Sequence, residues 1–309
     1  MRMIENFLTV IQQVLVLFVL IGVGVICGKG RILSKEAVKS CADVVLLFAT
    51  PCVIIQSFQR EPNAETLRGL GIAALAAVLV HAAGIGLAHL LIRDPDRARE
   101  RVLRFGTVFS NAGYMAIPLQ LALLGQDGVF YGATYVAVFN LVMWSYGVAL
   151  MGGRKQLSLR KLVLNPGVIG VAVGLLLFLG RISLPIVLAA PVGHLAALNT
   201  PVPMLIIGYY LADAKLLEAL RDARSYGTIA LRLLVIPLLT LGVLTLCGVR
   251  GTVLVSSVVG ASAPVATATT MFATKFDCDA RLSVNLVVVS TLLSMLTMPL
   301  IVALAQTAA

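Results

Sequence analysis

The sequence has few charged residues, few aromatic residues and only five cysteines. Charged residues make up 12% of the 309 positions and hydrophobic residues 59%, and the mean hydropathy is +0.99. A typical soluble domain contains about 25% charged residues. The shortage of charge therefore excludes an ordinary soluble domain and predicts a polytopic membrane protein.

Several catalytic and metal-binding signatures are also missing. The chain has no GxSxG, HExxH or Walker motif. Its cysteines show no CxxC or metal-ligand spacing, and we expect them to pack as small apolar residues: Cys27, Cys41, Cys52, Cys247 and Cys278. The glycine-rich stretch 22–28 lies inside an apolar segment, which indicates close helix packing rather than a dinucleotide loop. We therefore expect no metal, no cofactor and no enzymatic activity.

Ten apolar segments long enough to cross a bilayer follow one another along the chain. They cover residues 6–28, 37–58, 67–92, 102–124, 128–151, 162–180, 185–211, 227–248, 252–274 and 282–306. Lys and Arg gather in the connections after the odd-numbered segments, with 19 there against 5 on the other side. Because cytoplasmic loops are rich in Lys and Arg, this split predicts both termini outside the cytoplasm, in a cytoplasmic (inner) membrane. The net charge of +10 then reflects orientation in the lipid bilayer and not nucleic-acid binding.

Short sequence matches link the two halves of the chain. Residues 21–23, 30–32, 50–51 and 118 recur at 169–171, 180–182, 200–201 and 264, with offsets of 148, 150, 150 and 146. A repeat unit of five spans is odd in number, so its second copy enters the membrane in the opposite orientation. We expect a first repeat at 1–151, a cytoplasmic linker at 152–161 and an inverted second repeat at 162–309, an all-α five-plus-five architecture.

Polar residues interrupt two of the apolar segments near their centres. The first interruption runs from Ser110 to Leu119 and the second from Ser262 to Thr270. Proline and glycine there predict broken helices, which a membrane tolerates only where protein or water covers the freed backbone groups. Interrupted segments in corresponding halves are the best sequence-level pointer to the binding site of a transporter.

We expect the two broken helices to cross near the bilayer midplane and to present half-helix N-termini that favour an anion without any arginine. No carboxylate lies deep in a span, which also fits an anionic substrate. The residues predicted to line or shape the site are Ser110, Asn111, Gly113, Tyr114, Pro118, Pro264, Val265, Thr267 and Thr270. The alternative is a pair of proline kinks that bind no ligand.

Four more polar residues within or beside spans have two interpretations each. Asn140 and Asn285 are offset by 145, so each either points at the crossing or forms an interhelical hydrogen bond. His81 is either a proton relay or a hydrogen-bonded packing residue. Asp43, near the cytoplasmic end of the second segment, either couples an ion or pairs with a base at the interface.

The interrupted segments resemble the crossover motifs of the auxin efflux carrier family in its bacterial, short-loop form. The first motif of that family, Asn-x-Gly-aromatic-x-x-x-Pro-Leu, matches residues 111–119, and the second, Pro-Val-Ala-Thr, matches 264–267. A Ser-Thr-Leu-Leu-Ser run follows at 290–294, and Asn165-Pro166 opens the sixth segment as in the family. The resemblance covers essentially the whole chain.

This resemblance implies an elevator-type secondary carrier or uniporter. Segments 1, 2, 6 and 7 would form a scaffold that joins two copies into a homodimer, and segments 3–5 and 8–10 would form the transport domain. The implied substrates are small organic anions, either mono- or dicarboxylates such as malate and malonate or auxin-like weak acids. The bile-acid sodium symporter family shares the crossed-helix plan, so a sodium-coupled symporter is the alternative. A membrane sensor or an intramembrane enzyme has less support in the sequence.

Overall fold

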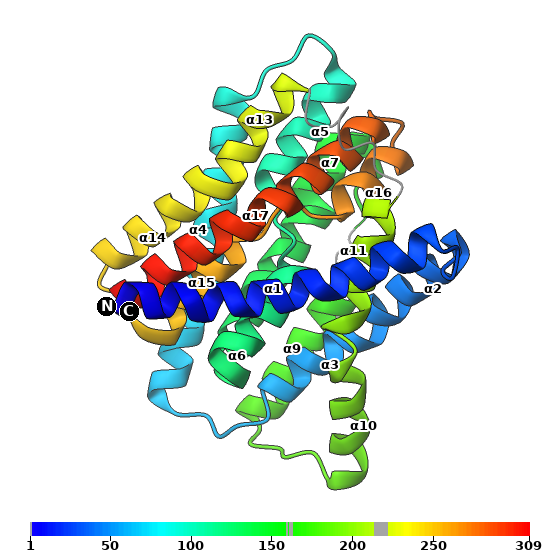
Figure 1. Cartoon of the computed structure of the whole chain (residues 1–309). Coiled ribbons are helices and arrows are strands. Elements are labelled where there is room, and N and C mark those ends of the chain that lie inside the picture. Colours follow the sequence, from blue (N-terminus) through cyan, green and yellow to red (C-terminus); the bar gives the residue numbers. More distant parts are fainter. Residues whose placement is uncertain (1, 159, 161–162, 213–221) are drawn as a thin grey trace.

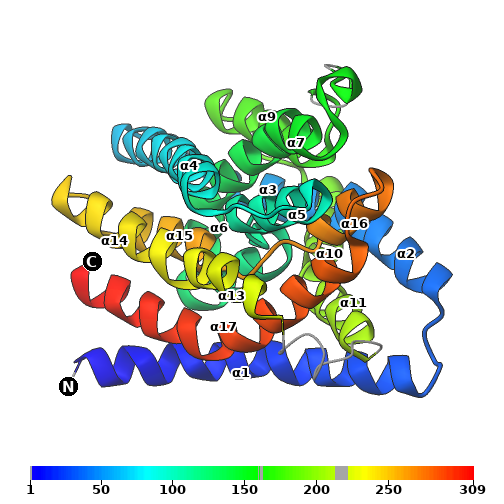
Figure 2. The same ribbon diagram turned by 90° about the horizontal axis from the view of Figure 1, so that it is seen from above.

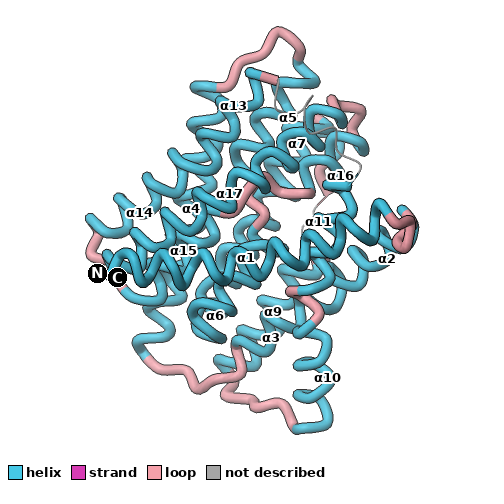
Figure 3. The backbone as a smooth tube through the Cα atoms, viewed as in Figure 1, coloured by secondary structure: helices cyan, strands magenta, loops and turns pink. Residues whose placement is uncertain are grey.

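The structure, a computed structural model, describes all residues except 1, 159, 161–162 and 213–221. The regular elements of the described residues are all helices (Figure 3), and an isolated bridge pairs Ser110 with Val265. Seven of the described helical stretches are long and apolar enough to cross a membrane, and two shorter apolar helices cover Pro166–Leu179 and Gly251–Ser262. The all-α, multi-pass organisation is confirmed, while the count of ten spans stays a prediction.

The first half of the chain contains helices on both sides of the first interruption. They are α1 (Arg2–Lys29), α2 (Lys35–Val44), η1 (Val45–Ala49), α3 (Thr50–Ser57), α4 (Ala64–Leu91), α5 (Arg97–Val108), η2 (Ala112–Ala116), α6 (Ile117–Val142), η3 (Met143–Gly147), α7 (Val148–Gly152) and η4 (Arg154–Gln156). The elements η1, η2 and η3 are π-helical turns, and η4 is a 3-10 turn. Gly125 has non-helical backbone angles and kinks α6.

The second half repeats this pattern of long helices and one interruption. Its elements are α9 (Pro166–Leu179), α10 (Ile186–Ala197), α11 (Pro201–Ala212), α13 (Ala223–Ala230), the π-helical turn η5 (Leu231–Val235), α14 (Ile236–Leu246), α15 (Gly251–Ser262), α16 (Ala268–Lys275) and α17 (Ala280–Ala308). In Figures 1 and 2, α1 runs alongside α17, so the two ends of the described chain lie near each other.

Small residues allow α1 to pack closely against α11. A Cβ atom on Gly24 would collide with the backbone of Leu205, and a Cβ atom on Gly208 would collide with the backbone of Ile21 and Gly24. Close approach of backbones through small residues is typical of helix pairs in membranes, where lipid tails supply no hydrophobic driving force between helices. The prediction that the glycine-rich stretch 22–28 serves helix packing is therefore confirmed.

Prolines explain three of the π-helical turns. Pro51, Pro118 and Pro237 each occupy the second position of an α-helix that directly follows such a turn. Because proline lacks an N–H group and crowds the preceding turn, the helix widens there. In each case the residue before the proline donates its N–H to the carbonyl five residues back, as Ile117 does to Ala112. The widened turn thus accommodates the proline without ending the helix.

The repeated sequence motifs adopt similar local structure. Arg31 and Arg181 have left-handed backbone angles, with φ of 54° and 52°. The following residues close the same turn, since the N–H groups of Ile32 and Ile182 donate to carbonyls five residues back at 2.9 and 2.8 Å. Thr50 of the first Thr-Pro motif also contacts the residue just before the second, because its buried hydroxyl donates to the side-chain oxygen of Asn199 at 2.8 Å.

Candidate functional site

The two helix interruptions meet inside the protein. Helix α5 ends at Val108 and η2 begins at Ala112, while α15 ends at Ser262 and α16 begins at Ala268. The N–H of Asn111 donates to the carbonyl of Pro264 at 2.7 Å, and the N–H of Ala266 donates to the carbonyl of Phe109 at 3.0 Å. Each interruption therefore satisfies backbone groups that the other leaves free, as a site away from water requires. We call residues 109–111 and 263–267 the paired interruption.

Two buried serines tie the paired interruption to the surrounding helices. The Ser110 hydroxyl donates to the carbonyl of Gly260, in the last turn of α15, at 2.9 Å, and lies 3.2 Å from the Tyr135 hydroxyl. Ser290, on α17, accepts a hydrogen bond from the N–H of Val265 at 3.1 Å. All of these groups are buried, so they fix the extended backbone in one geometry.

Arg232 contacts the C-terminal ends of α5 and α15, the two helices that lead into the paired interruption. Its side chain is fully buried on η5. The guanidinium donates to the carbonyls of Thr107 and Val108 at 3.2 and 3.1 Å, and also to the carbonyl of Ala261. A helix C-terminus carries about half a negative charge, so one cation stabilises the ends of both α5 and α15.

The sequence-based interpretation missed this residue. The Lys and Arg count assigned Arg232 to a cytoplasmic loop, whereas the structure places it on η5 against the ends of α5 and α15. The anion site at the half-helix N-termini, formed without arginine, stays a prediction. Without Arg232, 18 Lys and Arg residues lie on the predicted cytoplasmic side and 5 on the other, which predicts the same orientation of the chain in the membrane. Its position inside an apolar run was the available signal, since ionisable residues within spans are functional candidates.

The half-helices that leave the paired interruption start with unsatisfied polar groups. Asn111 precedes η2 and Thr267 precedes α16, and neither makes a side-chain capping bond. The side-chain Nδ2 of Asn111 and the hydroxyls of Thr269 and Thr291 are buried without a hydrogen-bond partner. Helix N-termini carry partial positive charge, and Asn111 and Thr269 lie at the starts of the two half-helices, so their donors together with the N-termini can bind an anion.

The predicted residues around these N-termini are only partly enclosed. Gly113, Tyr114, Thr267 and Thr270 are half-buried, whereas Ser110, Asn111, Pro264 and Val265 are buried. The turn η2 that carries Tyr114 packs against α6, α11 and α15. Asp43 is exposed on α2 and lies within electrostatic range of Tyr114. The structure thus brings Asp43 toward the side of the paired interruption that faces α11.

Pro118 does not break its helix, which corrects one expectation. The interruption precedes it by several residues, and Pro118 is buried as the second residue of α6 behind the widened turn η2. Pro264 differs, because it lies in the extended stretch itself and its carbonyl accepts the bond from Asn111. Only one of the two prolines therefore shapes the paired interruption directly.

No hydrogen bond of the described residues joins Asn140 to Asn285. The buried Asn140 donates to the carbonyl of Val136 at 2.8 Å, and its amide abuts Gly167 of α9. Asn285 is half-buried on α17. These contacts of Asn140 favour a role in packing between helices over a side chain that points at the paired interruption.

His81, on α4, lies close to the paired interruption. Its ring is buried, with its centroid 5.0 Å from the ring of Tyr135 and 6.3 Å from that of Phe109. One ring nitrogen, Nδ1, is 2.7 Å from the carbonyl oxygen of Ala77, while Nε2 has no partner. The contact between Nδ1 and the Ala77 carbonyl is what a hydrogen-bonded packing histidine would make. Because Nε2 has no partner, the alternative role of His81 as a proton relay stays a prediction.

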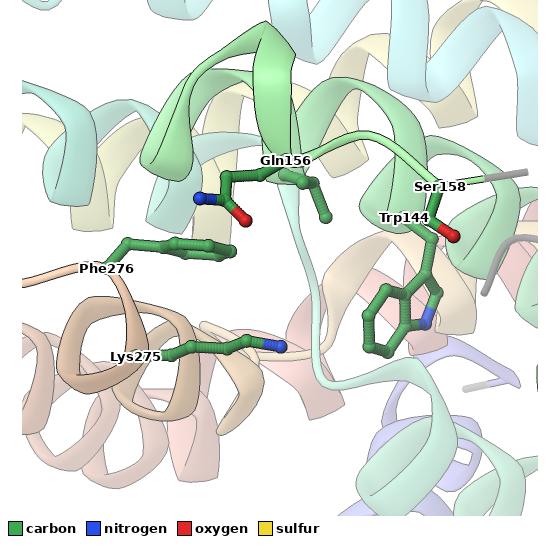
Figure 4. A pocket seen from close by; sticks show the side chains of 6 residues that line it. Trp144, Gln156, Ser158, Lys275 and Phe276 are labelled. Atoms are coloured by element: carbon green, nitrogen blue, oxygen red, sulfur yellow. The ribbon is translucent and has the colours of Figure 1, made fainter.

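A chain of aromatic rings connects the paired interruption to a small pocket near the linker. The ring centroids of Phe109, Phe105, Phe272 and Trp144 follow one another at 4.3, 5.2 and 5.6 Å. The pocket has a volume of about 10 Å³, room for about one water molecule. Figure 4 shows the Lys275 side chain extending toward the indole of Trp144, with its Nζ atom 5.8 Å from the ring centroid.

Comparison with known proteins covers nearly the whole chain. The family described as "Membrane transport protein" matches residues 9–158 and 155–302. An uncharacterized transporter of Methanothermobacter thermautotrophicus is 26% identical over 298 residues, which span 94% of this chain and 96% of the relative. A second uncharacterized transporter, from Methanocaldococcus jannaschii, is 23% identical over 300 residues, with 93% and 96% covered.

Proposed function

Because the chain belongs to the membrane transport protein family of auxin efflux carriers, we propose that it is a secondary carrier or uniporter for small organic anions. Mono- and dicarboxylates such as malate and malonate, or auxin-like weak acids, are the proposed substrates. The proposed architecture is a five-plus-five inverted repeat, which the matching turns at Arg31 and Arg181 support.

The paired interruption is the observation that carries this proposal. Its two half-helix N-termini and the free Nδ2 of Asn111 supply hydrogen-bond donors inside the protein. Arg232 adds a buried positive charge that forms no ion pair with any carboxylate in the described part of the chain. A buried charge costs several kcal/mol unless it is compensated. The helix C-termini compensate part of it, and a bound carboxylate near the N-termini would add to that compensation.

The proposed transport step follows from what surrounds the half-helices. Tyr114 on η2 is half-buried toward α11 and Asp43 of α2, elements of the proposed scaffold. A carboxylate bound by Asn111 and the N-termini would therefore lie between the scaffold and the proposed transport domain. The hydrogen bonds across the paired interruption join both half-helices into one unit, which can move relative to α1, α2 and α11 while it keeps the anion.

Ligand-induced thermal stabilisation tests the proposal. The purified protein would be heated with a panel of small carboxylates, each with and without sodium. A ligand at a hundredfold excess over its Kd stabilises by about 2.7 kcal/mol. We expect one carboxylate class to raise the Tm of the wild type and not that of Asn111→Ala, whose fold is retained because Nδ2 has no protein partner.

Asn140→Ala is the matched control, because it removes the same side chain from another buried position. It lowers the Tm of the free protein but keeps the carboxylate shift. Equal loss of the shift in both variants would contradict a site at Asn111. A shift that requires sodium would favour the symporter, and no shift with any anion would refute the anion proposal.

A further inference from the structure

A second cleft opens at one end of the molecule, away from the paired interruption. Its volume is about 390 Å³, within the usual range of small-molecule sites. The lining comes from the loop before α4, the first turns of α4, the part of α6 after its kink and the start of α15: Arg60, Glu65, Thr66, Arg68, Gly69, Ile72, Asp127, Tyr131, Arg250, Gly251, Thr252 and Val253. The start of α4 and the turn between α14 and α15 lie at the left in Figures 1 and 2.

The cleft concentrates positive charge on a face where charge is scarce. The Lys and Arg count leaves five cations on the predicted outer side, and Arg60, Arg68 and Arg250 line this cleft. Two carboxylates also line it, so an excess of one positive charge remains. The first turn of α15 adds backbone donors, because the N-cap residue Arg250 makes no side-chain capping bond to it. The excess of positive charge raises the local concentration of anions at the cleft.

Two of the three arginines are held in place by the protein. Arg60 lies 4.4 Å from the centroid of the Phe130 ring and pairs with Asp127 at 2.7 Å. Arg250 donates to the carbonyls of Thr245 and Val249 at 2.8 and 2.9 Å. These contacts fix the walls of the cleft before any ligand arrives, which lowers the entropic cost of binding.

The third arginine remains available to a ligand. Arg68 is exposed and forms no ion pair or side-chain hydrogen bond with the described residues. Beside it, Gly69 leaves room for Tyr131, because a Cβ atom there would lie 2.9 Å from the Tyr131 hydroxyl. The cleft therefore offers an exposed guanidinium and a phenolic hydroxyl, both suited to a carboxylate.

We propose that this cleft is an outer anion-binding site that collects small carboxylates before they reach, or after they leave, the paired interruption. The inference rests on the proposed function and on the predicted orientation. Free carboxylates and the headgroups of anionic lipids share the chemistry that the arginines recognise, and we assign the site to the free carboxylate.

Charge reversal at Arg68 tests this assignment. Uptake of a transported carboxylate would be measured in proteoliposomes with the cleft facing the added substrate, for Arg68→Glu and for Arg181→Glu. Arg181 is a matched control, because it is an exposed arginine on the same predicted face but outside the cleft. We expect Arg68→Glu to raise KM about threefold to tenfold with kcat unchanged, and Arg181→Glu to leave both unchanged.

Three arms of the experiment decide the outcome. The KM difference should shrink from about 0.01 M to about 1 M salt, because screening weakens exposed charges. It should persist in vesicles of phosphatidylcholine alone, and an effect seen only with phosphatidylglycerol would assign the cleft to lipid and overturn the proposal. Equal KM values for the two variants would also overturn it while transport by the wild type stands. No transport of any carboxylate by the wild type would refute the proposed function itself.

Discussion

In the first interruption the chain leaves α5 at Val108 and turns into η2 at Ala112 with no proline between, whereas in the second Pro264 lies in the gap between α15 and α16. Ala263, just before that proline, has the extended angles that a following proline favours, with φ −62° and ψ 147°. The same broken geometry therefore arises in two ways. Local chemistry enforces the second break, and hydrogen bonds to the second break hold the first one open.

The two interruptions also differ in the side chains that bind their backbone. Ser110 belongs to the first interruption and reaches out to the carbonyl of Gly260. In the second, the N–H of Val265 is satisfied from outside, by Ser290 of α17. Arg232 contacts the helix ends of both. Substitution of Arg232 should therefore affect both interruptions, and substitution of each serine should affect mainly one.

The largest expected effect is that of Arg232→Met, which removes the group common to both interruptions. Buried carbonyls of α5 and α15 lose their donor, so we expect a loss of about 3–5 kcal/mol in the free energy of unfolding, and no transport. Thermal unfolding in detergent measures the loss. Arg181→Met, at an exposed arginine, should change stability by no more than about 0.5 kcal/mol.

Arg232→Lys sharpens this test. The ammonium keeps the charge but is a compact point donor without the planar fork that spans two helix ends, so we expect stability between the wild type and Arg232→Met. Wild-type stability of Arg232→Met would show that the guanidinium does not hold the two helix ends.

The prolines should differ next. Pro264→Ala removes the residue that keeps Ala263 extended, and we expect the initial uptake rate per folded protein to fall about tenfold, a cost of about 1.4 kcal/mol. Pro118→Ala alters only the second position of α6, where alanine is helix-compatible, and uptake should stay within about twofold of the wild type. Equal impairment by both substitutions would mean that the two prolines act alike, against the difference seen in the structure.

The smallest expected effects are those of the two serine substitutions on the free energy of unfolding. Ser290→Ala leaves the buried N–H of Val265 without its acceptor, and we expect a loss of about 1 kcal/mol in the free energy of unfolding. Ser110→Ala should cost somewhat less, because it leaves the Gly260 carbonyl without a donor, and buried carbonyls without a full set of partners are tolerated better than buried N–H groups without an acceptor. Chemical denaturation of both variants would measure the order, and a larger loss for Ser110→Ala would reverse the comparison.

Sequence patterns located the interruptions, but they did not show which residues break the helices. Residues 110–119 and 262–270 contain polar residues within apolar segments, and the two interruptions of the structure, 109–111 and 263–267, overlap these stretches. The sequence treated Pro118 and Pro264 as equivalents because their offset, 146, is close to that of the other repeats. The equivalence is wrong at the level of the backbone, since a widened turn accommodates Pro118.

The sequence by itself determined what depends on averages over a segment or on short motifs: a helical membrane protein, two polar interruptions and membership of a transporter family. Only the tertiary structure decided which carbonyl receives which donor. Arg232 is one charge in an apolar run, and its role depends on helix ends more than a hundred residues away on one side and about thirty on the other. Backbone groups freed within a membrane must find partners wherever the fold provides them, and that pairing is not a local property of the chain.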